Sequence, residues 1–180
     1  QGAFPSDRYA AVSQIQWHGL DPATSMVQIA PRQGEQLLRH EDLVAEIARI
    51  GPRLALVLMP GIQYLTGQLL DLGALAKASH AVGARVGFDL AHAMGNVPLL
   101  LHDWGADFAV WCSYKYLNGG PGATAGAFVH EKHFDAHLPR LAGWWGNDLA
   151  NRFEFGTEFR PYAGAAGWQV SNTPLLGMVP

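Results

Sequence analysis

The amino-acid sequence predicts an α/β fold with a mostly parallel sheet sandwiched by helices. Apolar runs of strand length alternate with segments whose apolar residues recur at helical spacing, and this alternation is typical of parallel sheets. The run over residues 54–59 is continuously apolar, as expected of a strand covered on both faces. The length of 180 residues fits one domain with room for a core.

The first half of the chain shows three helical patterns, each followed by a glycine that can end a helix. Ser6 or Asp7 could cap the first of them. The expected helices cover residues 8–18, 40–50 and 71–82. The apolar stretches between them predict strands over residues 26–30 and 54–59.

The second half is expected to add three strands and one short helix. The strands are predicted over residues 85–89, 107–112 and 125–130, and the helix over 97–104. After about residue 131 the periodicity weakens. Residues 140–174 are rich in Gly, Trp, Phe and Arg, so we expect loops that cover a site or an interface.

Charge and cysteine content exclude several classes of protein. A net charge of −3 argues against a nucleic-acid partner, and no apolar run is long enough to predict a membrane span. Cys112 is the one cysteine, so no disulfide framework is expected and a cytoplasmic location is compatible. Both ends of the sequence fall inside a pattern, so we expect a fragment of a longer protein.

An acid and a lysine follow two of the predicted strands. Asp89 ends one strand, and Lys115 comes just past the next. Since ligands of parallel sheets bind beyond the carboxyl ends of the strands, both lie on the ligand side. Of the other lysines, Lys77 lies in a helical pattern and Lys132 in a polar HEKH turn, so both are expected to be solvated. A lysine among apolar neighbours is a better nucleophile. With an acid for a ring nitrogen, it predicts a pyridoxal phosphate site.

Each of these residues also has a purely structural explanation. Asp89 could cap the turn that follows it, and His92 could be an ordinary structural histidine. Lys115 could extend its amine to solvent beside a half-buried Tyr114. The glycine-rich segment 118–126 could simply form turns. The functional interpretation depends on these groups meeting at one place.

Competing motifs fail on spacing. The glycines of segment 118–126 do not have the spacing of a dinucleotide fingerprint, and no phosphate-binding P-loop motif occurs. Asp89, His92, His102 and Asp103 could be imagined as metal ligands, but the last two belong to a separate predicted helix. We therefore expect no metal.

The motifs FDLAHAMGN, LHDWGADFAVWCSYKYLNGGPG and AGAFVHEKH together resemble the kynureninase family, pyridoxal phosphate enzymes of the aspartate-aminotransferase-like fold (fold type I). FPSDRYA, MPGIQYLTGQ, LAGWWGNDLANRFEF and VSNTPLL extend the resemblance over essentially the whole chain. It implies hydrolysis of L-kynurenine, or its 3-hydroxy form, to anthranilate, or 3-hydroxyanthranilate, and L-alanine. It also implies a cytoplasmic homodimer that acts in tryptophan catabolism and pyridine nucleotide biosynthesis.

The resemblance also implies roles for individual residues. Lys115 would form the Schiff base with the cofactor, Tyr114 would bind phosphate and relay a proton, and Asp89 would pair with the pyridine nitrogen. His92 would lie near the ring, on which Phe4 would stack. The other implied cofactor contacts are Pro5, Ser6 and Asp7, which complete that wall, and Trp144 and Asn172, which we expect to reach the phosphate across the dimer interface.

Some family features are missing. Pro60 stands where some relatives have a small hydroxyl residue, so one cofactor contact would be lost or replaced. The threonine-bearing phosphate loop would lie upstream of Phe4, and the small C-terminal domain with the arginine for the substrate carboxylate beyond Pro180. Arg152 and Arg160 are not at its position. We therefore expect residues 1–180 to be a partial large cofactor-binding domain, inactive in isolation.

Other functions stay open. Cysteine desulfurases and related lyases of the same fold also combine an acid, a polar residue three positions on and a lysine, although the HDWG and WCSYKYLN context favours kynureninase. A non-catalytic truncated module would keep the fold without the chemistry. A nucleotide-binding module is the general alternative for an α/β chain, and the missing phosphate motif counts against it.

Overall fold

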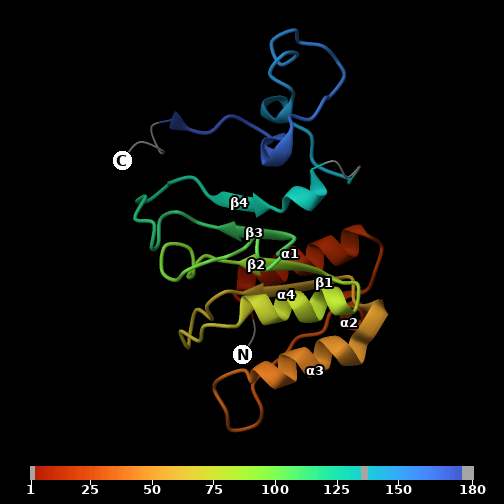
Figure 1. The fold of residues 1–180 in the computed structure, drawn as a ribbon, viewed down its shortest axis with the longest axis vertical. Helices are drawn as coiled ribbons and strands as arrows, with labels where there is room; N and C mark the ends of the chain where they lie inside the picture. Colours follow the sequence, from red (N-terminus) through yellow and green to blue (C-terminus); the bar gives the residue numbers. More distant parts are fainter. Residues whose placement is uncertain (1–2, 135–137, 176–180) are drawn as a thin grey trace.

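The computed structural model describes residues 3–134 and 138–175. Four strands form one sheet in the order β1-β2-β3-β4 (Figure 1). The first three are mutually parallel, and β4 pairs antiparallel with β3. Their bounds are Leu56–Pro60, Arg85–Asp89, Phe108–Trp111 and Gly126–Val129. The mostly parallel sheet predicted from the sequence is therefore confirmed.

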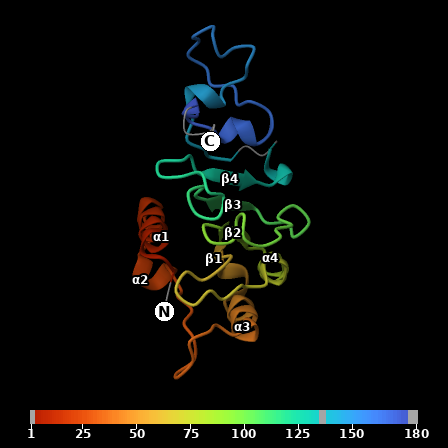
Figure 2. The ribbon, with the colours of Figure 1, turned by 90° about the vertical axis from the view of Figure 1, so that its left-hand side faces the viewer.

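Helices lie on both faces of this sheet, as predicted. Figure 2 shows α1 and α2 on one face and α3 and α4 on the other. These helices span Pro5–Trp17, Pro22–Ser25, His40–Ile50 and Leu72–Ala81. The two layers are unequal, because α1 buries none of its residues, whereas α3 and α4 together bury six. Short 3₁₀-helices occur at Gly51–Arg53, Glu131–His133, Trp144–Gly146 and Gly164–Trp168.

The core lies between the sheet and the layer formed by α3 and α4. Val86 and Phe88 of β2 are fully buried against Leu43 of α3 and Leu75 of α4. Each such side chain contributes roughly 1.5–3 kcal/mol on burial. Gly87 lies between them because the Phe108 ring passes directly over it, and a Cβ there would lie 2.1 Å from a ring carbon. The middle of β2 is thus fixed by close packing.

Three local predictions were wrong. Residues 26–30 form no strand, because they pair with no neighbour in the described chain. Residues 97–104 form no helix, since residues 98–100 have no regular structure and residues 101–104 form a turn. The apolar run 54–59 supplies β1, but β1 is an edge strand of the described sheet and Leu56 is 43% exposed. The strand enclosed on both faces is β2.

A buried carboxylate ties the amino end of β3 to its neighbours. Asp107 is 3% exposed and accepts hydrogen bonds from the Val86 amide (2.8 Å), His80 Nε2 (3.0 Å) and His133 Nε2 (2.7 Å). The Lys132 amine lies 3.0 Å away, so Lys132 is not simply solvated as predicted. Burial alone would raise the pKa of Asp107, but these hydrogen bonds outweigh it and hold the pKa well below its ordinary value.

Residues 138–175 continue beyond β4 as loops and short 3₁₀-helices, in line with the sequence prediction (Figure 1, top). An isolated bridge between Asn147 and Pro161 closes this segment, and the Arg152 guanidinium stacks 4.4 Å from the Trp145 ring centre. None of the helices in the described residues has the length and apolar character needed to cross a membrane.

Candidate active site

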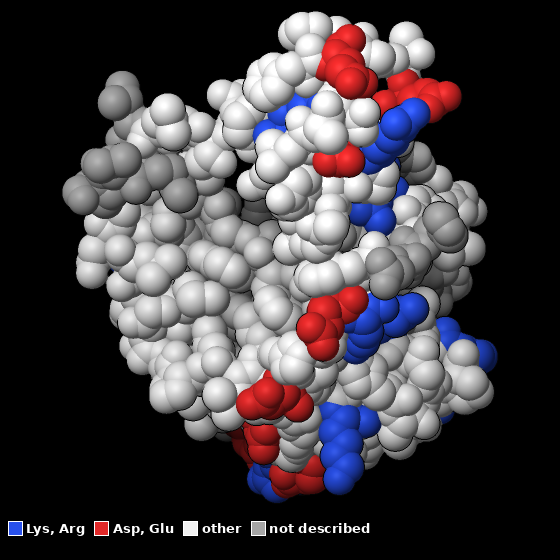
Figure 3. Space-filling model, turned by 45° about the horizontal axis from the view of Figure 1, so that its top comes forward, with Lys and Arg blue, Asp and Glu red and all other residues white. Residues whose placement is uncertain are grey.

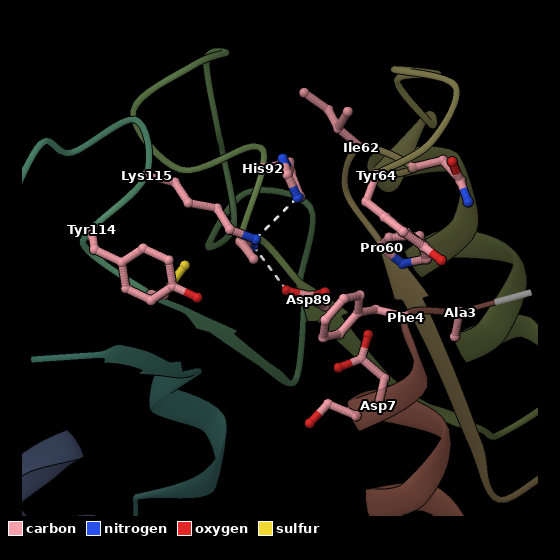
Figure 4. Close-up of a pocket in the computed structure, with 14 residues that line it drawn as sticks. Ala3, Phe4, Asp7, Pro60, Ile62, Tyr64, Asp89, His92, Tyr114 and Lys115 are labelled. Carbon is pink, nitrogen blue, oxygen red and sulfur yellow. Dashed lines mark hydrogen bonds between the residues drawn. The ribbon is translucent and has the colours of Figure 1, made fainter. Parts of the chain in front are cut away.

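A cavity of ≈180 Å³ opens at the carboxyl ends of the parallel strands. Pro60 ends β1 and pairs in register with Asp89, the last residue of β2. The chain leaving β3 adds the third side of the cavity. The α1 helix supplies the wall opposite this edge (Figure 4). The lining residues are Ala3, Phe4, Ser6, Asp7, Pro60, Ile62, Gln63, Tyr64, Asp89, Ala91, His92, Cys112, Tyr114 and Lys115.

Seven of the residues predicted for the site meet in this cavity. They come from three separate stretches of the chain: Phe4, Ser6 and Asp7; Asp89 and His92; and Tyr114 and Lys115. Pro5 begins α1 but does not line the cavity. The functional interpretation of Asp89 and Lys115 requires such a convergence.

Asp89 is held by the turn that follows β2. Its Oδ1 accepts the Ala91 amide at 2.8 Å, so the carboxylate does cap this turn. Its backbone carbonyl accepts the Gly61 amide at 2.7 Å, which ties the end of β2 to the loop after β1. A carboxylate that also lines the cavity is fixed in position by these contacts and remains open to a ligand.

Lys115 and His92 face each other across the cavity. The Lys115 amine lies 3.0 Å from His92 Nε2 (Figure 4). Burial and the nearby Lys115 charge lower the pKa of His92, and the Asp89 carboxylate partly offsets them. A neutral His92 imidazole can therefore accept a hydrogen bond from the Lys115 ammonium. Lys115 is half-buried beside this polar group, whereas the sequence suggested apolar neighbours.

The loop that carries Lys115 is fixed by backbone hydrogen bonds. The Asn118 amide donates to the Lys115 carbonyl, and the Gly119 amide donates to the Ser113 carbonyl at 2.9 Å. A Cβ on Gly119 would lie 2.9 Å from the Ala123 side chain, so this turn requires a glycine. The glycine-rich segment thus holds the lysine in place.

Tyr114 lies at the mouth of the cavity and is 54% exposed. A hydrogen bond with the Cys112 thiol, together with the charge at Cys112, raises the pKa of Tyr114. A phenol is protonated at neutral pH even at its ordinary pKa, so Tyr114 carries a proton that it can donate.

Phe4 and Asp7 form the α1 side of the cavity. Phe4 precedes the first turn of α1, and its ring meets Tyr64 edge-on at 5.3 Å between ring centres. Asp7 lies in that first turn. Burial, followed by the charge and a hydrogen bond of Asp89, raises the pKa of Asp7 to about 6, against the opposing charge of Lys115.

The sequence reasoning missed several lining residues, including Ile62, Gln63, Tyr64 and Cys112. A signal was present for the first three, because they directly follow β1, whose carboxyl end lies beside that of β2. Cys112 was considered only as an unpaired cysteine, although it precedes the predicted lysine by three residues.

Trp144 and Asn172 lie outside the cavity of this single chain. The Trp144 indole donates its N–H to the Arg152 carbonyl at 2.7 Å, and Asn172 Oδ1 lies 3.3 Å from the Ser171 hydroxyl. Their role across a dimer interface stays a prediction. Among the described residues, no group of three or more His, Cys, Asp or Glu side chains is arranged to hold a metal.

Comparison with known families identifies the fold family. A family model described as aminotransferase class-V matches residues 11–157. The chain belongs to the class-V aminotransferase family. The matched range includes the whole sheet and the loop that carries Lys115, so the family assignment covers most of the cavity.

Curated relatives named kynureninase match nearly the whole chain. The kynureninase of Xanthomonas campestris pv. campestris (strain B100) is 56% identical over 179 residues, and that of Stenotrophomonas maltophilia (strain K279a) is 56% identical over 180. Each match covers 99% of this chain and 42% of the relative. The resemblance drawn from the sequence motifs is confirmed, and the chain spans less than half the length of these relatives.

Solved structures show the same fold at low sequence identity. An apo cysteine desulfurase from Thermococcus onnurineus NA1 superposes with a TM-score of 0.71 at 19% identity, covering 98% of this chain and 40% of that one. The cystine C-S lyase C-DES, in complex with its product cysteine persulfide, gives 0.67 at 17% identity over 96% of this chain and 44% of that one. In another C-DES structure, glycine is covalently linked to the PLP cofactor. At these identities the likeness shows the fold alone.

Proposed function

We propose that this chain is a partial large domain of a pyridoxal phosphate-dependent hydrolase. The enzyme would cleave L-kynurenine or 3-hydroxykynurenine to anthranilate or 3-hydroxyanthranilate and L-alanine, in tryptophan catabolism and pyridine nucleotide biosynthesis in the cytoplasm. The observation that carries this proposal is the 56% identity to curated kynureninases over 99% of the chain. A match over 179 residues spans the four stretches that line the cavity, which fall within residues 3–7, 60–64, 89–92 and 112–115.

The chemistry of the lining residues fits pyridoxal phosphate. The cavity offers an amine on Lys115 for an aldehyde, a carboxylate on Asp89 for a cationic ring nitrogen, and the flat ring of Phe4. When bound, the cofactor supplies an electron sink for negative charge at the substrate α-carbon. Among the described lining residues, the Ser6 and Tyr114 hydroxyls are available to phosphate. Two hydroxyl groups are few for a doubly charged phosphate group. This agrees with the proposal that further phosphate contacts come from outside this chain.

Lys115 is the proposed point of covalent attachment and, once free, the base that takes the α-proton. Its amine is already oriented by the 3.0 Å contact with His92. Because burial and the Lys115 charge lower the pKa of His92, its imidazole is favoured in the neutral form and can accept a hydrogen bond from the ammonium. Asp89, fixed by the Ala91 amide, would keep a ring nitrogen protonated by its negative charge.

Tyr114 is the proposed proton donor to the alanine-forming carbon. A phenol keeps its proton at neutral pH, and the contact with Cys112 raises the pKa of Tyr114 further above its ordinary value. Its half-exposed position at the cavity mouth lets solvent restore that proton after each turnover. Proton donation of this kind contributes about 10²–10⁴-fold to a rate.

A homodimer is part of the proposal. Figure 3 shows a face on which charged side chains gather along one side, while the remainder carries none. Segments 54–70, 116–130 and 161–175 contain no Lys, Arg, Asp or Glu. They expose Leu65, Leu117 and Val170 to 45–59%. An uncharged apolar surface suits self-association, and a second copy could bring Trp144 and Asn172 to the phosphate.

A direct assay separates this function from the alternative lyase. The full-length protein, given L-kynurenine, is expected to release fluorescent anthranilate; given L-cysteine, it is expected to release no sulfide above background. Tyr114→Phe should lower anthranilate formation by about 10²–10⁴-fold, whereas Tyr9→Phe, on the exposed side of α1, should not. Sulfide release without anthranilate would instead support a desulfurase, and absence of any cofactor absorbance would support a non-catalytic module.

A further inference from the structure

The two loops that leave β2 and β3 lock together outside the cavity. One loop carries His92 and the other carries Lys115. At Gly95 the first loop passes so close to the second that a Cβ would lie 3.0 Å from the Tyr116 carbonyl oxygen. The Asn96 side chain closes the first loop by donating to the His92 carbonyl at 3.0 Å. The backbones of His92 and Tyr116 are therefore held in fixed positions.

Hydrogen bonds fix the His92 imidazole less firmly than its backbone. Its Nε2 faces the Lys115 amine at 3.0 Å (Figure 4). Within the described residues, its Nδ1 has no hydrogen-bond partner. A histidine that acts through one ring nitrogen is commonly oriented by a hydrogen bond at the other. A single hydrogen bond at Nε2 leaves the ring able to turn about its side-chain bonds, so a second contact is needed to keep it facing the amine.

A tyrosine ring supplies that second contact. Tyr116 directly follows Lys115 but does not line the cavity, and it is 47% exposed. Its ring meets the His92 imidazole edge-on, with 6.3 Å between the ring centres and 67° between the ring planes. Aromatic rings attract each other in this arrangement at separations of about 4.5–7 Å. Among the described residues, the Tyr116 hydroxyl has no hydrogen-bond partner, so the ring alone makes the contact.

We propose that Tyr116 is a positioning residue, which holds the His92 imidazole against the Lys115 amine from outside the cavity. The inference rests on the proposed function, in which Lys115 binds the cofactor and takes the α-proton. With the imidazole held, the amine starts each proton transfer from a fixed place. An aromatic pair of this kind shifts an equilibrium between two orientations by about two- to tenfold. The two tyrosines beside Lys115 thus differ, because Tyr114 faces the cavity and Tyr116 supports its wall.

The competing explanation is that Tyr116 only stabilises its own loop. That role would act through the close approach to Gly95 and the packing of the loop, so it would be independent of the His92 ring. Removal of the Tyr116 ring would then have the same effect whether or not the imidazole is present. The positioning role predicts instead that substitutions of Tyr116 and His92 are not additive.

The first test uses the full-length apoprotein with isotope-labelled histidine and records the His92 ring signals by NMR, assigned by their loss in His92→Gln. In the native protein and in Tyr116→Phe, Lys115→Met should shift these signals, because the amine contacts Nε2 directly. In Tyr116→Leu the same Lys115→Met substitution should shift them much less.

The matched control for this test is Tyr9→Leu, on the exposed side of α1, which should respond like the native protein. An equal response in Tyr116→Leu and the native protein overturns the proposal, whether or not the proposed enzymatic function is correct. A reduced response in Tyr116→Phe would assign the contact to the hydroxyl and would also overturn it.

The second test measures kcat and KM of the full-length holoenzyme with L-kynurenine. Tyr116→Leu should lower kcat by about two- to tenfold and leave KM nearly unchanged, while Tyr116→Phe and Tyr9→Leu should match the native protein. In a His92→Gln background, Tyr116→Leu should have no further effect. An undiminished loss in that background overturns the positioning role in favour of a structural one. Failure of the native protein to form anthranilate overturns the proposed function, and with it the part of Lys115 in catalysis, and leaves the NMR result standing.

Discussion

Asp89 and Asp107 are two acids at opposite ends of adjacent parallel strands, and their surroundings differ in kind. Asp107, at the amino end of β3, is 3% exposed and surrounded by histidine, arginine, lysine and amide donors. Asp89, at the carboxyl end of β2, accepts one backbone amide and lies in the cavity between the Lys115 amine and Asp7 (Figure 4). The saturated acid fixes the sheet, and the unsaturated one is left free to bind. We infer that hydrogen-bond saturation separates a carboxylate that stabilises the sheet from one that is left available to a ligand.

The largest effect on stability is expected at the saturated acid. Asp107→Ala removes the common partner of His80, Arg85, Lys132 and His133 and should destabilise the protein by about 3 kcal/mol. Asp89→Ala should cost less than about 1 kcal/mol in the apoprotein, since it loses one half-buried turn cap. Urea unfolding of both variants measures the difference. Equal losses would remove the distinction between the two acids.

The reverse order is expected for cofactor binding. Asp89→Asn keeps the shape of the side chain but removes the charge that would meet a ring nitrogen. A charged hydrogen bond contributes about 1.5–3 kcal/mol, so pyridoxal phosphate affinity should fall by roughly 10–100-fold. Glu46→Gln, on the outer side of α3, serves as the matched control. An unchanged dissociation constant in Asp89→Asn would move the ring partner elsewhere.

The smallest expected effect is on the pH dependence of stability, where Asp107 is compared with Asp7, the acid beside Asp89 in the cavity. The pKa of Asp107 is lower in the folded than in the unfolded state, so its contribution to stability is complete above about pH 4 and is lost as the pH falls below it. The pKa of Asp7 is raised to about 6, so the opposite holds: stability from this group is present below about pH 4 and declines as the pH rises to 6.

Unfolding curves of Asp107→Asn and Asp7→Asn separate the contributions of these two acids to stability. They are measured between about pH 3 and 7, a range that brackets the usual pKa values of carboxyl groups. Asp107→Asn should flatten the acid limb of the profile, and Asp7→Asn should flatten the limb between about pH 4 and 6. Identical profiles for the two variants would contradict the assigned directions of their pKa values.

Much of the fold was predictable because its signals are local. The apolar runs and helical spacing located all four strands and the helices α1, α3 and α4. The strand-end positions of Asp89 and Lys115 then placed them at one edge without any knowledge of their contacts. The error at residues 26–30 arose because a strand needs a partner strand, and the short apolar pattern at 97–104 did not distinguish a helix from a turn.

The parts of the site that escaped prediction depend on distant contacts. Nothing in the spacing of Asp7 indicates that α1 brings it to Asp89, 82 residues later in the chain, and the resemblance assigned it only to a wall of the cavity. The same holds for Tyr64, which meets Phe4 from another element. The sequence indicates only that Asp107 begins a buried strand. The donors to its carboxylate come from α4, β2 and the segment after β4, so local spacing does not reveal them.

The central claim is that Lys115 carries the cofactor. The decisive measurement is borohydride reduction of the full-length holoenzyme followed by peptide mass spectrometry, in the native protein, Lys115→Ala and Lys77→Ala. Lys77 lies exposed on α4 and serves as the control. We predict that the reduced cofactor is found on the peptide containing Lys115, is lost in Lys115→Ala and is retained in Lys77→Ala. Cofactor attached at Lys77 or Lys132, or still attached in Lys115→Ala, would contradict the account.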